Sequence, residues 1–291
     1  MNPENPPAFH RWRPAALLRV SGEDSATFLQ GQFTNDLQKI IPGGAVYGLW
    51  LNQKGKTLAD SFVVRISKHE FRVVSYFSAA AVIRERLEAY VIADDVVIED
   101  LTAQATAMTV FGDDPIPSAI PANALTFSGR RARTPHTEII FPSGESRPHG
   151  GSMFPNAEIS RLEMERRRIN ARIPAVPFDI GPADLPNEGG LERQAISFTK
   201  GCYLGQEVMA RLKSMGQVRR TLGFVKGSGA APLAPAALFQ AGRKIGELRS
   251  AVGEGGNWIG LALLSRLQVA HGKGLALDAT GPAEIFIGAD A

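Results

Sequence analysis

The sequence predicts an α+β fold. Strand-like and helix-like patterns are mixed along its 291 residues without the strict alternation that a parallel α/β sheet requires. Residues 57–66 have the period-2 pattern of a strand, in which Phe62, Val64 and Ile66 alternate with their neighbours. Residues 79–92 have the apolar spacing of an amphipathic helix. After residue 219 only short strand patterns occur, and glycines separate them.

Eight elements are expected in the first 111 residues. A helix is expected at 24–37, where four apolar residues recur at helical spacing and Ser21 is placed to act as the cap. A second helix is expected at 79–92. Strands are expected at residues 17–20, 45–51, 57–66, 71–76, 96–101 and 106–111.

The middle of the chain is less regular. Between residues 112 and 151 proline, glycine, serine and arginine are frequent, and only 138–141 has a clear strand pattern. A very basic helix is expected at 157–169, followed by a long loop at 174–190. Loops of this length are often functional.

The C-terminal part begins after the predicted helix Gln206–Met215. Strand patterns at 221–225, 237–239, 244–252 and 258–264 predict a small β-barrel. We therefore expect two regions, with residues 1–215 containing two interleaved subdomains and residues 216–291 forming the barrel domain.

Composition excludes several classes of protein. The formal net charge of +3 is too small to indicate nucleic-acid binding by itself, so no direct nucleic-acid partner is expected. A single cysteine excludes an intrachain disulfide and a self-sufficient cysteine-ligated metal site. There is no apolar run long enough for a membrane span, and residues 1–13 lack the apolar core of a signal peptide. We therefore expect a cytoplasmic protein without a membrane association or a bound metal.

The strongest motif surrounds that cysteine, Cys202, in the segment Lys200–Glu207. Gly201 and Gly205 flank it and permit backbone geometries or close approaches that a side chain would block. Cys202 precedes a predicted helix whose N-terminal dipole favours a thiolate, and Lys200 would lie on the same side of an extended segment. These features indicate a reactive or ligand-binding thiol. The alternative is a small buried residue, as free cysteines often are.

This segment, continued through Ala210 and Arg211, resembles the K-G-C-Y-x-G-Q-E motif of the YgfZ family of folate-binding proteins. Residues 28–36 resemble the family's F-L-x-G-x-x-T-N-D motif. Residues 51–60 resemble its L-N-x-x-G-R-x-x-x-D hairpin, and residues 246–250 fit its G-x-V-x-S pattern with Leu248 in place of valine. The resemblance covers nearly the whole chain and is weakest over 112–155.

The resemblance implies the ring-like, multi-domain fold of the glycine-cleavage aminomethyltransferases, with tetrahydrofolate in a central channel. It also implies an accessory protein for the maturation or repair of iron–sulfur enzymes, with a link to tRNA modification. The partners would then be folate and iron–sulfur assembly proteins or client enzymes, and we expect a monomer. Cys202 would be the functional thiol, through either redox chemistry or a cluster shared with a partner.

The candidate folate-binding residues are Asp60, Asn35, Asp36, Lys200, Tyr203 and Arg168. Asp60 could hydrogen-bond a pterin ring, or it could satisfy amides at the hairpin end. Asn35 and Asp36 could bind the ligand or end the first helix. Arg168, in a run with three other arginines, could recognise the glutamate tail of folate because guanidinium groups bind carboxylates bidentately. The alternative is a solvated helix face.

Two departures from the aminomethyltransferases bear on catalysis. Those enzymes have paired aspartates where this chain has Ala59 and Asp60, and a glutamate near the place of Asn170. A carboxylate is needed to manage the proton of the folate nitrogen. The departures argue against aminomethyl transfer and leave folate binding expected. A folate-dependent aminomethyl- or methyltransferase is the second hypothesis, and an interaction module that has lost its ligand is the third.

Overall fold

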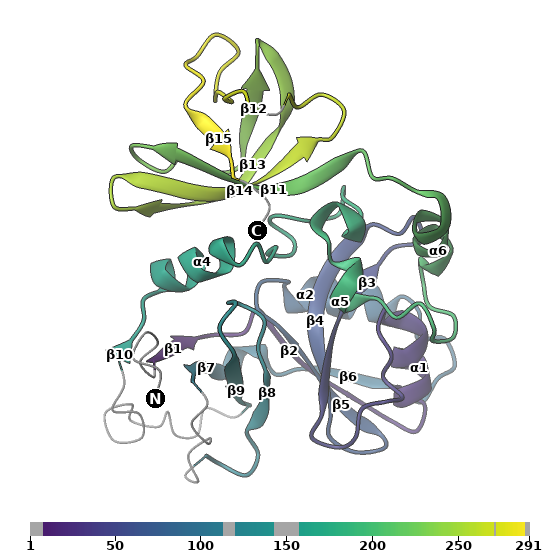
Figure 1. Ribbon diagram of the computed structural model, residues 1–291. Helices are drawn as coiled ribbons and strands as arrows, with labels where there is room; N and C mark the ends of the chain where they lie inside the picture. The colour runs from purple at the N-terminus through teal and green to yellow at the C-terminus, as the bar shows by residue number, and fades with distance from the viewer. Residues whose placement is uncertain (1–7, 113–119, 143–156, 271, 289–291) are drawn as a thin grey trace.

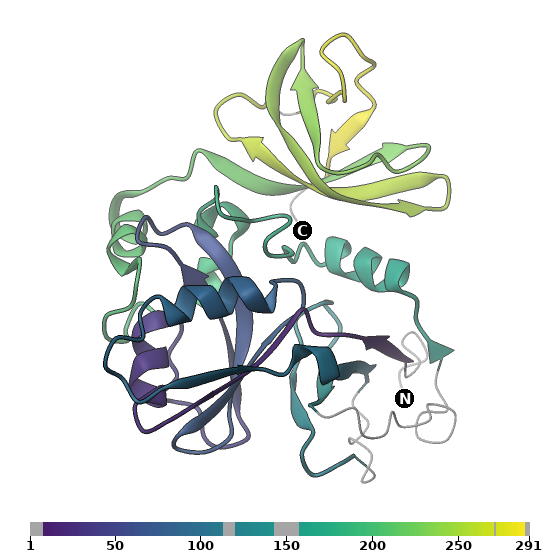
Figure 2. The ribbon, with the colours of Figure 1, turned by 180° about the vertical axis from the view of Figure 1, so that it is seen from behind.

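The computed structural model describes residues 8–112, 120–142, 157–270 and 272–288. Three five-stranded sheets make up most of the molecule, and Figures 1 and 2 show it from opposite sides. The mixed α+β content agrees with the prediction. Among the described residues, no helix is both long enough and apolar enough to cross a membrane.

The central sheet is antiparallel, and its strand order is β3-β4-β5-β2-β6. Its strands are β2 (Ala16–Ser21), β3 (Ala45–Leu51), β4 (Thr57–Arg65), β5 (Glu70–Ser75) and β6 (Val97–Asp100). Helices α1 (Ser25–Gln32) and α2 (Ala80–Glu88) supply side chains to the core on one face, where Leu29 and Ile83 are fully buried beside Val63. A second hydrophobic core covers the other face of the sheet, so both faces of its strands are apolar.

The second sheet has the order β10-β1-β7-β9-β8. Its strands are β1 (Ala8–Trp12), β7 (Thr106–Phe111), β8 (Leu125–Ser128), β9 (His136–Phe141) and β10 (Ala157–Glu158). The short helix η1 (Thr102–Gln104) precedes β7. Strands β1 and β8 were not expected from the sequence, because β1 contains His10 and Arg11 and β8 is only four residues long.

Several predicted boundaries need correction. The helix expected at 24–37 ends at Gln32, because the backbone of Phe33 is extended. Ser21 lies in β2 and does not cap that helix. The basic helix α4 is shorter than expected at Arg161–Asn170, because residues 157–158 pair with β1. Its N-cap is Ser160, which accepts a hydrogen bond from the Glu163 amide.

Short helices follow α4 in the chain. The loop at 174–190 contains only the short helix η2 (Pro186–Gly189), and α5 (Glu192–Ala195) follows it. Helix α6 has the predicted bounds, Gln206–Met215. Its most buried side chain is Met209, which the sequence pattern had not singled out.

The C-terminal sheet is a curled half-barrel with the order β12-β13-β14-β11-β15. Its strands are β11 (Arg220–Ser228), β12 (Ala236–Gln240), β13 (Arg243–Glu254), β14 (Asn257–Ser265) and β15 (Ile285–Ile287). Isolated bridges pair Phe239 with Ala276 and Leu275 with Ile285. The segment 275–276 therefore connects the edge strands β12 and β15. The barrel expected at this end is thus a curled sheet linked at its edges by single bridges.

Helix α4 lies between the half-barrel and the second sheet (Figures 1 and 2). Ile169 at its C-terminal end packs against Val252, Ile259 and Leu261 of the half-barrel.

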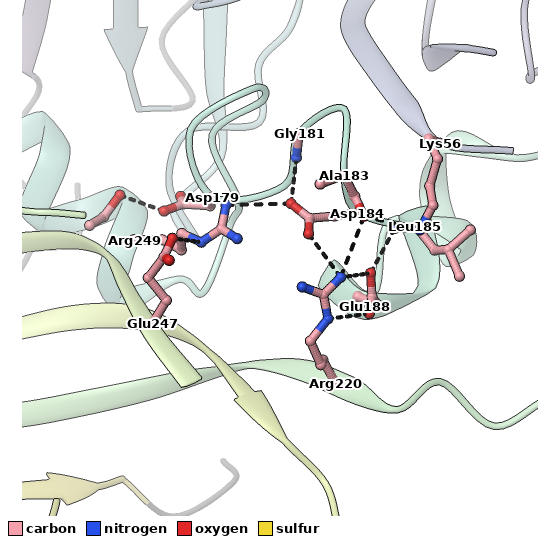
Figure 3. A network of polar contacts seen from close by, with 11 residues as sticks. Lys56, Asp179, Gly181, Ala183, Asp184, Leu185, Glu188, Arg220, Glu247 and Arg249 are labelled. Carbon is pink, nitrogen blue, oxygen red and sulfur yellow. Dashed lines mark hydrogen bonds and ion pairs between the residues drawn. The ribbon is translucent and has the colours of Figure 1, made fainter. Parts of the chain in front are cut away.

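A polar network joins the half-barrel to the loop at 174–190 (Figure 3). Arg220 of β11 lies 3.0 Å from the Asp184 carboxylate and 2.8 Å from that of Glu188. Arg249 of β13 contacts Asp184 at 3.4 Å. Both carboxylates are almost fully buried, so the arginines compensate charges that would otherwise be unpaired in the interior.

Candidate functional site

A cavity of about 910 Å³ lies between the second sheet, the half-barrel and the segment that follows β5 of the central sheet. The C-terminal end of β1, the residues that follow β5 and one face of α4 contribute to its wall. The loop at 174–190 and strand β13 of the half-barrel complete it. Pockets for small ligands and cofactors typically have volumes of roughly 300–1,000 Å³, so this cavity is large enough for a cofactor.

One wall of the cavity combines aromatic rings with a buried cation. The guanidinium carbon of Arg131 lies 4.5 Å from the ring centroid of Trp12 and 4.6 Å from that of Tyr76. Behind this wall, the fully buried Glu138 accepts hydrogen bonds from Trp12 Nε1 at 3.1 Å and Tyr76 Oη at 2.8 Å. It also accepts one from Thr109 at 2.7 Å. Because Glu138 orients both rings, the wall is a preorganised surface for a planar ligand.

Arginines dominate the charge of the cavity. The six that line it are Arg11, Arg13, Arg131, Arg161, Arg168 and Arg249. Two glutamates also line it, and both are paired: Glu165 with Arg168, and Glu247 with Arg249 at 2.8 Å. The cavity therefore favours a ligand that carries negative charge.

The predicted site residue Arg168 is one of these arginines, and its side chain is 2% exposed. It donates to Asp179 Oδ2 at 2.6 Å, to the Ile173 carbonyl at 2.6 Å and to Ser250 Oγ at 2.9 Å. Burial disfavours its charge, but Asp179 and Glu165 raise its pKa above the ordinary value. Through these contacts Arg168 connects α4 to the loop at 174–190 and to the half-barrel.

Asp60 lies behind the cavity wall and does not line the cavity. Its carboxylate accepts hydrogen bonds from Tyr47 Oη at 2.8 Å, Ser78 Oγ at 2.8 Å and Ser75 Oγ at 3.1 Å. Burial raises its pKa, although these donors oppose the shift. Since Ser75 and Ser78 flank the cavity-lining residue Tyr76, Asp60 holds the segment that forms the wall.

Lys200 is buried against the C-terminal end of α1. Its ammonium donates to the carbonyls of Gln30 at 2.6 Å, Phe33 at 2.6 Å and Asn35 at 3.0 Å. Burial lowers its pKa to about 8, although the charge of Asp36 opposes that shift. Lys200 was expected to lie on the same side of the segment as the Cys202 thiol. Its ammonium instead donates all three hydrogens to carbonyls of α1 and of the turn after it.

Asn35 and Asp36 form the turn that Lys200 binds. The Asn35 side chain donates to the carbonyls of Tyr47 at 2.9 Å and Gln194 at 3.0 Å. The Asp36 carboxylate accepts a hydrogen bond from Gln30 at 3.0 Å, and the pKa of Asp36 lies below its usual range. Burial by itself would raise that pKa, but the hydrogen bonds that the carboxylate accepts outweigh this effect. Neither residue lines the cavity.

Cys202 is exposed, and it precedes α6. Gly205, the N-cap of α6, has a positive φ of 87°, and a Cβ at this position would approach the Asn52 carbonyl to 2.9 Å. A Cβ on Gly201 would meet nothing within 4 Å, so only one of the two glycines is required by close packing. The alternative in which Cys202 is buried is wrong.

Tyr203 follows the cysteine and points in the opposite direction, into the core. Its hydroxyl has no hydrogen-bond partner among the described residues, and burial raises its pKa to about 12.

The predicted residues therefore lie in three places. Arg168 lines the cavity, Asp60 supports its wall, and the other five belong to the α1–α6 region, which we define as residues 30–36 and 200–206. The sequence analysis missed Trp12, Tyr76 and Glu138. No spacing pattern connects them, because each comes from a different strand or strand end. Within the described residues, no group of three or more His, Cys, Asp or Glu side chains could hold a metal ion.

Comparisons with known proteins agree with this architecture. Residues 15–116 match the family model described as the GCVT N-terminal domain. The human protein named iron-sulfur cluster assembly factor IBA57, mitochondrial, is 29% identical over 91% of this chain and 82% of its own length. The tRNA-modifying protein YgfZ of Hamiltonella defensa is 25% identical over 72% of this chain and 67% of its own length. These matches support the relationship to the YgfZ and IBA57 proteins that the sequence motifs predicted.

The chain also resembles an enzyme in its fold. The glycine cleavage system aminomethyltransferase T from Bartonella henselae superposes with a TM-score of 0.78 and covers 97% of this chain. The match covers 84% of that enzyme, and the sequence identity is 17%, so the likeness concerns the fold alone. The aminomethyltransferase-like fold predicted from the sequence motifs is confirmed.

Proposed function

We propose that this protein binds a reduced folate, tetrahydrofolate, in the cavity and supports the maturation or repair of iron–sulfur enzymes. The observation that carries the proposal is the cavity itself, which is bounded by the second sheet, the segment after β5 and the half-barrel, and is lined by both aromatic rings and arginines. The names of the IBA57 relatives, which are iron-sulfur cluster assembly factors, support the second half of the proposal.

The residues present fit a folate. Trp12 and Tyr76 offer ring faces to a pterin or to the aminobenzoyl ring, and Phe178 offers a third that is 59% exposed. The exposed arginines Arg13 and Arg161 suit the carboxylates of the glutamate tail, since guanidinium groups bind carboxylates through paired hydrogen bonds. When bound, a reduced folate carries one-carbon units, and these residues would bind and orient it.

The arrangement supports binding more than aminomethyl transfer. Both oxygens of Asp60 already accept hydrogen bonds, and the carboxylate does not reach the cavity. Ala59 is fully buried on the opposite face of β4, and Asn170 does not line the cavity. No unpaired carboxylate among the described lining residues is therefore placed to manage a folate proton.

The thiol of Cys202 is proposed as the group offered to a partner protein. It is exposed, it does not line the cavity, and one thiolate needs further ligands from elsewhere to hold a cluster. The proposal therefore separates two surfaces, one for folate and one for an iron–sulfur assembly protein or client enzyme. The monomeric state, the cytoplasmic location and the absence of a direct nucleic-acid partner stay predictions.

Calorimetric titration with tetrahydrofolate tests the first surface. We expect saturable binding, and we expect Phe178→Ala to weaken it about tenfold through loss of ring stacking, which is worth roughly 1–3 kcal/mol. Leu267→Ala is the matched control, because Leu267 is 88% exposed and does not line the cavity. An absence of saturable binding, or equal weakening by both substitutions, would contradict the assignment of the cavity.

Complementation tests the second surface. In a strain that lacks this protein, we expect Cys202→Ala to restore cluster-enzyme activity poorly while it keeps the wild-type affinity for tetrahydrofolate. The substitution should change the free energy of unfolding by less than about 0.5 kcal/mol, because the Cys202 side chain is exposed. Full restoration of the cluster enzymes by Cys202→Ala would rule out the thiol role and leave folate binding standing.

A further inference from the structure

A second hollow lies against α4 and has a different lining. Its volume is about 540 Å³, and it is bounded by the segment 132–134, the C-terminal end of α4 and Phe224 of β11. It shares no lining residue with the large cavity. Three of its residues are arginines, namely Arg133, Arg167 and Arg172, and none of the described residues that line it is acidic.

The three arginines are held in different ways. Arg133 is exposed and forms no ion pair or hydrogen bond with a described residue. Arg167 donates to Glu163 at 2.8 Å and lies over the ring of Phe111 at 4.6 Å, which fixes its position. The charge of Arg167 is compensated by Glu163, which lies outside the lining, whereas no described residue compensates the charge of Arg133.

Arg172 has an unusual backbone conformation. Its φ is +58°, a left-handed value at the end of a helix where glycine is the usual residue. For a residue with a side chain this conformation is unfavourable by roughly 1–2 kcal/mol. It places the guanidinium 5.6 Å from the ring centroid of Phe224. A strained residue whose side chain enters a charged hollow is typical of a functional site.

We propose that this hollow binds the phosphate group of a nucleotide. Three guanidinium groups match the charge and the several acceptor oxygens of a phosphate, and the amide of Asn170 adds a neutral donor. Phe224, with Arg172 beside it, offers a surface on which a base can stack. The inference goes beyond the proposed function, because no residue of this hollow lines the folate cavity.

Titration of the full chain with inorganic phosphate, adenosine monophosphate and a short single-stranded oligoribonucleotide tests the proposal. We expect the monophosphate to bind more tightly than inorganic phosphate, because the base adds stacking. Arg133→Gln should weaken binding about tenfold or more, since hydrogen bonds between charged groups are worth roughly 1.5–3 kcal/mol. Arg243→Gln is the control, because it removes the same charge from the exposed start of β13 in the half-barrel.

Arg172→Gly separates folding from binding. Glycine relieves the left-handed backbone, so we expect unchanged or higher thermal stability together with binding at least tenfold weaker. Unaltered binding by both Arg133→Gln and Arg172→Gly would overturn the proposal. Equal weakening by Arg243→Gln would also overturn it, as would an absence of saturable binding of all three probes.

The probes also identify the source of the phosphate. Equal affinity for the monophosphate and for the oligoribonucleotide would assign the hollow to a free nucleotide. Tighter binding of the oligoribonucleotide with a steep dependence on salt would assign it to an RNA strand. Tetrahydrofolate affinity should be unchanged in Arg133→Gln, so failure of this proposal and failure of the folate proposal are distinguishable.

Discussion

Lys200 shows how one side chain in the cysteine motif can serve the fold. Its ammonium binds three carbonyls at and beyond the C-terminal end of α1, the end of a helix where a cation is favoured. The spacing to Cys202 indicated that it would activate the thiol, but its contacts attach the motif to α1. Sequence could not reveal this, because the acceptors lie about 165 residues earlier in the chain.

This position of Lys200 predicts a dependence of stability on pH. The pKa is about 8 in the folded state and 10.5 ordinarily, so the unfolded chain binds more protons between these values. Stability from this group therefore rises as pH increases from 8 to 10.5, and it is lost as pH falls through 8.

Chemical denaturation across this range should show the effect. The unfolding free energy of the wild type should increase with pH relative to that of Lys200→Met. A constant difference between the two proteins would mean that the ammonium is not the titrating group.

Arg168 and Asp60 show a similar limit of sequence reasoning. Both residues were predicted to bind the ligand, and both are buried at or next to the cavity. Their partners, such as Asp179 and Ser250 for Arg168, come from other elements and become visible only in three dimensions. The sequence thus indicated which residues are important, but it did not indicate which residues they contact.

At the scale of elements, periodic patterns predicted most strands and the existence of α1, α2, α4 and α6, because burial of one face imposes the period. Helix α6 has the predicted bounds, and strand β3 does too. The errors occur where tertiary contacts override local pattern. Helix α1 stops at Gln32 because Phe33 pairs with Trp50 of the central sheet, and β10 exists only because β1 lies beside it.

The two glycines around Cys202 provide a matched pair for a prediction. Gly205→Ala should destabilise the protein by about 1–2 kcal/mol, because φ is 87° and the new Cβ would crowd the Asn52 carbonyl. Gly201→Ala should change stability by less than about 0.5 kcal/mol, since its Cβ meets nothing. Urea denaturation of both variants measures the difference, and equal effects would contradict this reading of the α6 N-terminus.

At the scale of the whole molecule, the cavity depends on how the half-barrel sits on the rest of the chain. The arrangement followed from resemblance to a family and not from periodicity, because no pattern specifies which distant surfaces meet. The network of Figure 3 holds this arrangement through Arg220 and Arg249, which compensate the buried Asp184.

Removal of Arg220 should therefore affect the junction. Arg220→Met leaves Glu188 without its cation, and we expect a loss of about 2 kcal/mol, less than for a fully buried pair because Arg220 is 37% exposed. Arg243→Met should change stability by less than about 0.5 kcal/mol. Thermal unfolding of both variants checks the prediction, and similar melting temperatures would show that the junction does not depend on this pair.

The composition of the cavity wall also has a consequence for biosynthesis. Its residues run from His10 in β1 to Ser250 in β13, so the wall is complete only when the second half of β13 has been made. A nascent chain on the ribosome could fold the central sheet early, since that sheet ends at Asp100. The folate proposed to bind in the cavity would be retained only after nearly the whole chain has emerged, so its retention would report completed synthesis.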